Sequence, residues 1–554
     1  MKIDNEKQYS HIDQAFADFI LRLTGREQDT VAEQAVLELS DAVSSGASCI
    51  EVSDELKKYL LENCAAAIGE YQEKQLTLPL LFDGNYLYFQ KLLKYEIFLA
   101  ELFLDIAQRE VPALPAEADT DLLFSTLEKS AASEEKKAAV RTQKEAVKRS
   151  LAHPLAVICG GPGTGKTTVA SALLAMELQR VAPDRIALLA PTGKAHVRLK
   201  ESLLEDSQKF DIPENIRKHF ENLSGGTIHR FLAWGSRGPK YHAQNPAPYD
   251  LILVDECSMI SLHTMTALLS ALEKNTRVIL LGDAAQLASI DAGLIFPDLC
   301  SAASAAQDGP LKDIVSTLAY NFRAEKAGEL IALAENLREG KLPESTVIPA
   351  TPPLKKFAET FTQITANARK IRDLCETQTP ESLDEAFKLL EEYKIICPVT
   401  QNNPFGTQGI NKAVLKTLDI DENSYGVPIM IRHNNYDLEL FNGDTGLIVP
   451  GKKAVFPGKE EPLPLAVLPE YDIAYAITAH KSQGSGYKNV LLLLPEEEHK
   501  LVNRPLIYTA VTRARLSAVI YGNRKVIETA LKDTGHRASG LAQRLLQLNS
   551  LNKD

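Results

Sequence analysis

Short apolar runs alternate with amphipathic stretches along the chain from about residue 135 onward. Four of these runs are PLAVICG (154–160), RIALLAPT (185–192), YDLILVDE (249–256) and RVILLGD (277–283), and each ends in small or polar residues. Apolar runs separated by helical patterns are typical of parallel strands that crossover helices cover on both faces. We therefore expect a parallel sheet whose functional residues lie at the carboxyl ends of its strands.

A second group of runs predicts another α/β domain of the same kind: YKIICPV (393–399), KNVLLLLP (488–495) and SAVIYGN (517–523). The proline-rich stretch at 341–356 marks a hinge between the two domains. Between residues 427 and 459 the pattern changes to short strands with turns at Asn434-Asn435 and Asn442-Gly443-Asp444. We interpret this part as a small, β-barrel-like insertion in the second α/β domain, at about residues 424–470.

The first 110 residues have a different character. Apolar residues recur at three- and four-residue spacing over 13–24 and 95–108, which predicts helices. Residues 78–90 (LPLLFDGNYLYFQ) favour strands around an Asp83-Gly84-Asn85 turn, and 110–121 are typical of a linker. The predicted organisation is a mostly helical domain over 1–112, a first α/β domain over 113–340 and a second over 341–554.

Composition and charge narrow the class of protein. The polar N-terminal segment is unlike a signal peptide, and no run of about 18 apolar residues predicts a membrane span. Seven cysteines without a C-x-x-C pair favour reduced thiols in a cytoplasmic protein over disulfides or a zinc site. The net charge is −12, but residues 1–110 hold 20 Asp and Glu against 10 Lys and Arg, so the remainder is nearly neutral. The acidic first segment is therefore a poor surface for nucleic acid.

A phosphate-binding loop follows the first apolar run. Gly160, Gly165, Lys166 and Thr167 fit the pattern G-x-x-x-x-G-K-[ST] between a strand and a helix. Glycines let backbone N–H groups approach phosphate oxygens, and the following helix directs its positive end at the same place. Lys166 is expected on the β- and γ-phosphates and Thr167 on Mg²⁺. The residues expected around ATP in this loop are Gly160, Gly161, Pro162, Gly163, Thr164, Gly165, Lys166, Thr167 and Thr168.

Two later strand ends offer groups for hydrolysis. In LILVDECSM, Asp255 is expected to hold Mg²⁺ and Glu256 to polarise the attacking water, although an Asp-Glu pair after a strand is also a common helix cap. Gln286 in RVILLGDAAQL is suited to sense a γ-phosphate, and its alternative role is that of a polar loop residue. Arg323 and Arg513 supply planar cations for the charge that spreads over the γ-phosphate in the transition state.

Taken in order, these segments resemble the superfamily 1 helicases. The resemblance covers about residues 140–540 and includes GGPGTGKTT, VDECSM, LLGDAAQLASIDAG, NFR and YTAVTRAR. APTGKA, TIHR and HKSQGS point within that group to the RecD branch, whose members move 5′ to 3′ along single-stranded DNA. The stretch LPLLFDGNYLYFQKLLKYE (78–96) is similar, more weakly, to the partner-binding domain of the RecD subunit of exonuclease V.

The resemblance implies an α/β fold of two RecA-like P-loop domains with parallel sheets, a helical N-terminal domain and the β-rich, SH3-like insertion. It implies that Gln143 reads the adenine edge, and that Arg323 and Arg513 face the γ-phosphate across the cleft. It also assigns contacts with single-stranded DNA to Thr192, Lys194, Thr227, His229, Thr478, His480 and Ser482. His229 has an equally common alternative as a packed or capping residue. Many relatives carry an acidic, ribose-binding residue at the position of Gly486, so the contact with the ribose stays open.

The expected function is that of an ATP- and Mg²⁺-dependent 5′→3′ DNA translocase. By resemblance it acts on single-stranded DNA and duplex ends in the bacterial cytoplasm, at the nucleoid, as the motor that joins RecB and RecC in a heterotrimer for double-strand break repair and recombination. One alternative is a stand-alone RecD-like helicase, against which the acidic first 110 residues argue. The other is a scaffolding subunit with an ATP switch, against which Glu256, Gln286 and the two arginines argue. Neither Trp234 nor Phe231 can be assigned as a base-stacking ring.

Overall fold

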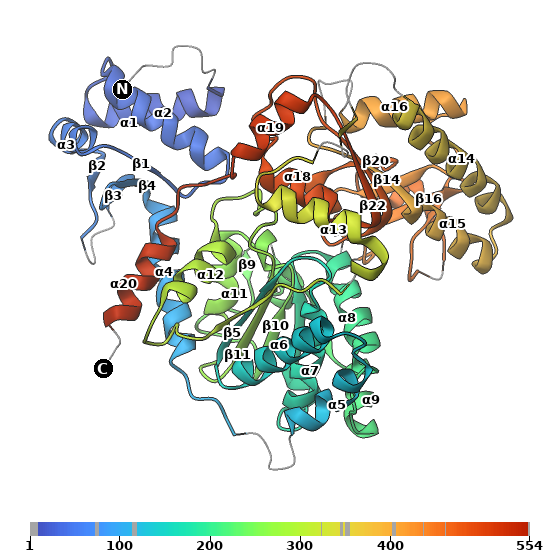
Figure 1. Ribbon diagram of the computed structural model, residues 1–554. Helices are drawn as coiled ribbons and strands as arrows, with labels where there is room; N and C mark the ends of the chain where they lie inside the picture. The colour runs from blue at the N-terminus through green and yellow to red at the C-terminus, as the bar shows by residue number, and fades with distance from the viewer. Residues whose placement is uncertain are drawn as a thin grey trace.

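The chain forms an N-terminal unit, two α/β lobes and an antiparallel sheet inserted into the second lobe (Figure 1). The computed structural model describes residues 9–72, 77–113, 119–235, 237–322, 324–343, 347–348, 355–400, 406–435, 437–459 and 461–551. Within these ranges no helix is long and apolar enough to cross a membrane. All seven cysteines are unpaired, as their spacing predicts.

The first lobe is built on a six-stranded sheet of order β12-β5-β11-β10-β6-β7. Every neighbouring pair is parallel, which confirms the prediction from the apolar runs. The strands are β5 (Leu155–Gly160), β6 (Ile186–Ala190), β7 (Ser224–Thr227), β10 (Leu251–Val254), β11 (Arg277–Gly282) and β12 (Val315–Leu318).

Alternate residues of each strand enter two different cores, because successive side chains of a strand point to opposite faces. Val157 and Ile252 pack in one core, whereas Ile158 and Leu253 pack in the other. The first core includes α10 (Ile228–Phe231), α11 (Leu262–Ser270) and α12 (Ile295–Ala305), together with α4 (Gln90–Ala107) and α20 (Leu541–Leu551) from the two ends of the chain. Those of the second are α5 (Thr120–Ser130), α6 (Glu134–Leu151), α7 (Lys166–Glu177), α8 (Gly193–Ser207) and α9 (Glu214–Glu221). A short ribbon, β8 (Trp234–Gly235) with β9 (Gly238–Pro239), follows α10.

The second lobe has a parallel five-stranded sheet of order β13-β22-β21-β14-β20. Its strands are β13 (Val347–Ile348), β14 (Tyr393–Cys397), β20 (Ala476–Thr478), β21 (Tyr487–Leu493) and β22 (Ala514–Tyr521). One face packs with α13 (Ala324–Arg338), α17 (Ala479–Ser482), α18 (Arg504–Val511) and α19 (Arg524–Lys532), and the other with α14 (Lys355–Thr377) and α16 (Thr407–Leu418). Helix α15 (Pro380–Glu392) packs on α14. The second predicted α/β sheet is therefore present.

The insertion between α16 and β20 is an antiparallel sheet of order β18-β17-β16-β15-β19. Its strands are β15 (Pro428–Ile431), β16 (Thr445–Val449), β17 (Lys453–Val455), β18 (Leu463–Pro464) and β19 (Tyr471–Ile473). Gly443 and Gly451 occupy the left-handed region, at φ 93° and 86°, where the chain turns. The β-rich character matches the sequence pattern, and the barrel-like closure stays a prediction.

The N-terminal unit combines a sheet of order β1-β4-β3-β2 with helices. Its elements are α1 (His11–Thr24), α2 (Thr30–Ser44), β1 (Cys49–Glu51), α3 (Asp54–Asn63), β2 (Ile68–Glu70), β3 (Leu80–Asp83), β4 (Tyr86–Phe89) and α4 (Gln90–Ala107). The C-terminal helix α20 (Leu541–Leu551) returns to this unit and packs on α4 and α12 (Figure 1).

Packing runs across both predicted domain boundaries. Apolar residues of α4 share a core with the sheet of the first lobe. Helix α13 packs against α18 and β22 of the second lobe, although it precedes residue 340. The boundaries at 112 and 340 therefore stay predictions, and removal of the first 110 residues would open the core of the first lobe.

Candidate nucleotide and nucleic-acid site

The phosphate-binding loop joins the end of β5 to the start of α7. Gly163 and Gly165 have φ of 82° and 84°, which residues with a Cβ rarely adopt, and Gly165 is the N-cap of α7. Lys166 Nζ donates to the carbonyl oxygens of Gly160 and Gly161, at 2.6 and 3.1 Å. The loop is also held from outside, since Asn321 Nδ2 donates to Pro162 O at 2.8 Å. The backbone therefore has the concave form that an anion requires.

Gln143 of α6 reaches the same loop from another element. Its side chain is buried, and a Cβ at Gly165 would lie only 2.0 Å from Gln143 Nε2. The left-handed φ of Gly165 disfavours any residue with a Cβ here, and the amide of Gln143 occupies the space that such a Cβ would take. The structure brings the predicted adenine-reading residue next to the loop, in the lining of the cavity described below.

The two acidic residues after β10 lie in the same cleft. Asp255 Oδ1 accepts a hydrogen bond from the backbone N–H of Glu256 at 2.8 Å. Burial, and then the charge of Glu256, raise the pKa of Asp255, while Lys166 opposes them. Glu256 has φ 52°, an uncommon conformation for a residue with a Cβ. A buried carboxylate with a raised pKa favours a bound cation, which fits the predicted Mg²⁺ ligand.

The loop after β11 presents Asp283 and Gln286. Gln286 Nε2 donates to Asp283 Oδ2 at 3.2 Å, which fixes the amide. Gln286 Oε1 is buried, and no hydrogen-bond partner for it occurs within the described part of the chain. A buried amide oxygen normally has a donor, so this one is available to a ligand or a water molecule in the cleft.

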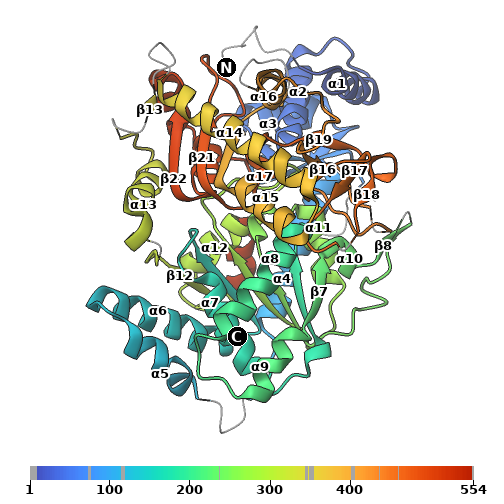
Figure 2. The ribbon, with the colours of Figure 1, turned by 90° about the vertical axis from the view of Figure 1, so that its right-hand side faces the viewer.

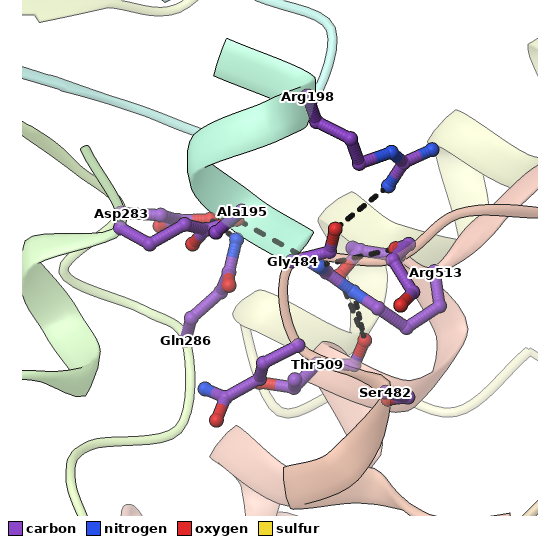
Figure 3. Close-up of polar contacts among 12 residues, drawn as sticks. Ala195, Arg198, Asp283, Gln286, Ser482, Gly484, Thr509 and Arg513 are labelled. Carbon is purple, nitrogen blue, oxygen red and sulfur yellow. Dashed lines mark hydrogen bonds and ion pairs between the residues drawn. The ribbon is translucent and has the colours of Figure 1, made fainter. Parts of the chain in front are cut away.

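One cavity of about 630 Å³ is lined by Lys166, Asp255, Glu256 and Gln286 of the first lobe together with residues of the second lobe, whereas Asp283 is not part of the lining. Arg513, which follows α18, lies in it with its Nη1 4.0 Å from Glu256 Oε1. The guanidinium is held by the second lobe, through Nε to Thr509 O at 3.2 Å and Nη1 to Ser485 O at 3.4 Å. Figure 3 shows Asp283 and Gln286 on one side of the cleft, facing Gly484 and Arg513 on the other. Arg323, the other predicted arginine, lies outside the described residues.

A second cavity, of about 380 Å³, also spans the two lobes. Four of the predicted DNA-binding residues line it together: Thr192 and Lys194 at the start of α8, His229 on α10, and His480 on α17. Asn442 and Gly443 of the inserted sheet complete the lining, and Figure 2 shows that sheet on the same side of the molecule as α10 and β8. The cavity therefore has walls from the first lobe, the second lobe and the insertion.

Three threonines predicted to touch DNA are helix caps. The hydroxyls of Thr192, Thr227 and Thr478 accept hydrogen bonds from the third backbone N–H of α8, α10 and α17, at 3.2, 3.2 and 3.3 Å. Helix N-termini attract anions, and the N-cap of α8, Thr192, lines the second cavity. Thr227 and Thr478 are not part of that lining, to which α10 and α17 contribute His229 and His480. Ser482 differs, because it is fully buried and its hydroxyl donates to Ala479 O at 2.6 Å. Its burial does not support the predicted direct contact with a strand.

Both histidines of this cavity are neutral at pH 7. Burial lowers the pKa of His229, and burial together with the charge of Arg537 lowers the pKa of His480 to about 4. His229 stacks on Trp234 with ring centroids 5.1 Å apart, and Phe231 packs against Tyr249 at 5.3 Å. Trp234 and Phe231 are therefore engaged with protein rings.

The chain is similar to two known domain families and to curated proteins. The AAA domain family matches residues 143–292, and the UvrD-like helicase C-terminal domain family matches residues 473–521. RecBCD enzyme subunit RecD of Mycolicibacterium smegmatis is 33% identical over an alignment of 437 residues that covers 73% of this chain and 74% of that one. The chain belongs to the RecD family.

Other known proteins are also similar to this chain. The RecBCD enzyme subunit RecD of Haemophilus influenzae is 31% identical over 74% of this RecD-family chain and 72% of its own length. The ATP-dependent RecD2 DNA helicase of Deinococcus radiodurans is 29% identical over 66% of this chain and 46% of its own length. Among solved structures, the Pif1 helicase of Candida albicans aligns over 74% of this chain and 98% of its own, with 14% identity and a TM-score of 0.41.

The position of Gly486 in this RecD-family chain is surrounded by cations. A Cβ there would lie 3.2 Å from both Arg198 Nη2 and Arg515 Nε. Arg198 Nη1 also donates to Gly484 O at 2.9 Å, across the two lobes (Figure 3). Both arginines line the nucleotide cavity, so guanidinium groups occupy the space into which an acidic side chain would extend.

Sequence reasoning missed several residues that line or support the two cavities. Arg198 lies three residues after APTGKA and Arg515 ends YTAVTRAR, but nothing in either segment indicates where these long side chains point. Tyr508 begins YTAVTRAR, and only the structure reveals that its hydroxyl crosses to Asp283 at 3.1 Å. Ile290, which is 70% exposed in the groove, could be suspected only as an apolar residue within a polar loop.

Proposed function

We propose that this RecD-family chain is an ATP-driven translocase and helicase that moves 5′ to 3′ on single-stranded DNA. The observation that carries the proposal is the cavity in which Lys166 and Glu256 of the first lobe meet Arg513 of the second. Catalytic groups divided between two lobes make hydrolysis depend on lobe closure. In this proposal a second cavity across the same lobes holds the DNA strand, so that lobe closure moves the strand.

The residues fit Mg²⁺–ATP. In this proposal the loop from Gly160 to Thr168 holds the phosphates and Gln143, which lines the same cavity, reads the adenine edge. Thr167 and Asp255 would hold Mg²⁺, which would neutralise charge that develops on the phosphate oxygens. Glu256 is the base that polarises the attacking water, and Gln286 Oε1 is free to accept from it. Arg513, and in this proposal Arg323, stabilise the transferring phosphoryl group.

Stepping follows from the loss of that charge. While a γ-phosphate is present, the guanidinium of Arg513 attracts the second lobe to the first, and hydrolysis removes the attraction. If Thr192 and Lys194 hold the strand in one phase and Thr478 and His480 in the other, the cycle moves the strand in one direction. Contacts of this kind address the DNA backbone, so binding is indifferent to sequence and weakens with salt.

The same chain acts, in this proposal, as the motor subunit of a RecBCD enzyme, with RecB and RecC as partners in the bacterial cytoplasm. Relatives that are 31–33% identical carry the name RecBCD enzyme subunit RecD. The N-terminal unit offers a docking surface, because it is acidic and leaves Phe19, Leu23 and Val31 on α1 and α2 between 44 and 53% exposed. The exposed apolar face argues against a stand-alone helicase, which does not need a docking surface. Glu256 and Arg513 argue against a scaffold with an ATP switch, which does not need catalytic groups for rapid hydrolysis.

Unwinding of tailed duplexes tests the motor and its direction. The chain alone and its complex with RecB and RecC are given duplexes with either a 5′ or a 3′ single-stranded tail. Each sample is paired with the same sample carrying the Lys166→Gln variant, so that unwinding by this chain is distinguished from unwinding by another subunit of the complex. We expect 5′-tailed unwinding that the variant abolishes, together with its DNA-stimulated ATP hydrolysis. Normal turnover by the variant, or unwinding only from 3′ tails by the isolated chain, would contradict the proposal.

Docking is tested without opening the core of the first lobe. The triple variant Phe19→Ser, Leu23→Ser, Val31→Ser changes exposed side chains and leaves α4 intact. It is expected to lose co-purification with RecB and RecC while keeping its unfolding temperature. The matched control is Leu516→Ser, an exposed apolar residue on β22 that is 45% exposed. Release by the control but not by the triple variant would place the docking face elsewhere.

A further inference from the structure

Tyr508 of the second lobe enters the nucleotide site of the first. Its side chain, on α18, is 4% exposed, and its hydroxyl donates to Asp283 Oδ2 at 3.1 Å. A Cβ at Gly161 would lie 3.1 Å from the same hydroxyl. The phosphate-binding loop, the loop after β11 and helix α18 therefore meet at one point.

Asp283 is held by hydrogen bonds alone. Its Oδ1 accepts from Ala285 N at 3.0 Å, and its Oδ2 accepts from both Gln286 Nε2 and the Tyr508 hydroxyl. No lysine, arginine or histidine of the described ranges forms an ion pair with Asp283. The tyrosine is therefore the one contact among these that comes from the second lobe, and it acts on the carboxylate oxygen that also fixes Gln286.

The second lobe also holds the rest of this loop, through α18 and through the residue after α17. Thr509 Oγ1 on α18 accepts from Leu287 N at 2.8 Å, and Gln483 Nε2 after α17 donates to Leu287 O at 2.8 Å. The second lobe thus touches the loop at Asp283 and again at Leu287, on either side of Gln286. Figure 3 shows Asp283 and Gln286 on the first lobe and Thr509 and Arg513 on the second. Movement of α18 away from the first lobe would release the contacts of Tyr508 and Thr509 together.

We propose that Tyr508 is a positioning residue for hydrolysis: its hydroxyl holds Asp283, and Asp283 holds the Gln286 amide, so that Gln286 Oε1 meets the attacking water only when the lobes are closed. The inference deepens the proposed function and rests on it. Arg513 provides positive charge for the transition state, whereas Tyr508 fixes the orientation of Asp283 and Gln286. Both side chains leave the site when α18 moves.

The test is a kinetic comparison of Tyr508→Phe with wild type at saturating single-stranded DNA. Loss of one hydrogen bond to a charged group is expected to lower kcat about tenfold, while KM for ATP changes less than twofold. The control is Tyr475→Phe, in the core of the second lobe and equally buried, which should leave kcat unchanged. Matching unfolding temperatures for the two variants separate positioning from damage to the fold.

A double-mutant cycle decides whether the hydroxyl acts through Asp283. In an Asp283→Ala background, Tyr508→Phe should lower kcat by less than twofold. An undiminished tenfold loss there, an unchanged kcat in Tyr508→Phe alone, or a rise in KM with normal kcat would each overturn the inference. Failure of the proposed function would appear differently, as normal ATP hydrolysis in Lys166→Gln.

Discussion

Arg513 Nη1 lies 4.0 Å from Glu256 Oε1, although the two residues belong to different lobes. The side chain of Arg513 is 6% exposed and that of Glu256 is 21% exposed, so the pair meets in a largely dehydrated cleft. Charges attract more strongly there than at the surface. In this position the guanidinium of Arg513 and the carboxylate of Glu256 are close enough to act on the same transferring phosphoryl group and its attacking water.

Replacement of Arg513 by alanine tests this relationship. Because the cation acts on transition-state charge, kcat for ATP should fall by about 10³-fold or more, with a much smaller change in KM. Steady-state hydrolysis at saturating single-stranded DNA measures it. The control Arg524→Ala removes a half-exposed arginine that pairs with Glu528 on α19, and should keep full activity. A tenfold or smaller effect of Arg513→Ala would leave the arginine without a catalytic role.

A second prediction concerns Lys194 in the groove. This lysine lines the cavity with Thr192 and His480, and burial lowers its pKa to about 8, so it is still mostly charged at pH 7. If it contacts one backbone phosphate, Lys194→Ala should reduce the slope of log K against log salt by about 0.7 for a single strand. Titration of a labelled oligonucleotide at several salt concentrations gives the slope. Lys388→Ala, an exposed lysine of α15, should leave it unchanged.

The polar residues that follow β10 and β11 could be predicted from the sequence, and the structure confirms both strands. Asp255 and Glu256 follow β10, and Gln286 follows β11, because uninterrupted apolar runs identify buried parallel strands and leave the polar residues at their ends. Gly165 could be expected because the loop needs a left-handed φ. These features are local, and a sequence expresses local features directly.

Contacts between lobes could not be read in the same way. Tyr508 and Asp283 are 225 residues apart, and nothing in either segment gives the relative orientation of the lobes. Ser482 shows the converse difficulty, since it lies in the expected segment but its side chain turns inward to Ala479 O, and its contact with DNA stays a prediction. The helix after β20 is so short that its sequence does not show which of its side chains face the protein and which face solvent.

A third prediction concerns stability. Glu177, the last residue of α7, forms ion pairs with Arg277 and Arg180, and the three side chains are 0%, 4% and 7% exposed. Arg277 Nη2 also donates to Ser150 O and His153 O at 2.9 Å. Removal of the carboxylate by Glu177→Leu leaves two buried guanidinium groups without their partner and should destabilise the chain by about 3–5 kcal/mol. The urea midpoint of unfolding measures the loss. The exposed pair on α19 gives the control, since Glu528→Gln should change stability by less than about 1 kcal/mol.

The triple variant Glu177→Leu, Arg180→Met, Arg277→Met separates the charge from the packing. If the loss arises from uncompensated guanidinium groups, their removal should restore a large part of it. Equal instability of the single and triple variants would mean that shape, and not charge, governs this site.

The last prediction concerns pH and His480. The unfolded side chain has a pKa near 6.5, whereas burial and Arg537 lower the folded pKa to about 4. Below pH 6.5 the unfolded state therefore takes up a proton that the folded state refuses. The stability linked to His480 is complete above pH 6.5 and is lost as the pH falls toward 4. Between pH 7 and 4.5 the wild-type chain should lose about 2–3 kcal/mol more than His480→Asn does.

Urea unfolding of both chains at half-unit pH intervals measures that difference, and the exposed His242→Asn variant is the control. Other titrating groups contribute equally to all three chains, so only the difference between profiles is assigned to His480. Because this imidazole stays neutral between pH 6 and 8, the affinity for single-stranded DNA should depend on pH in the same way for the wild-type and His480→Asn chains over that range. Parallel stability profiles for the wild-type and His480→Asn chains would show that the imidazole titrates as freely in the folded groove as in water, and that the groove around it is open to solvent.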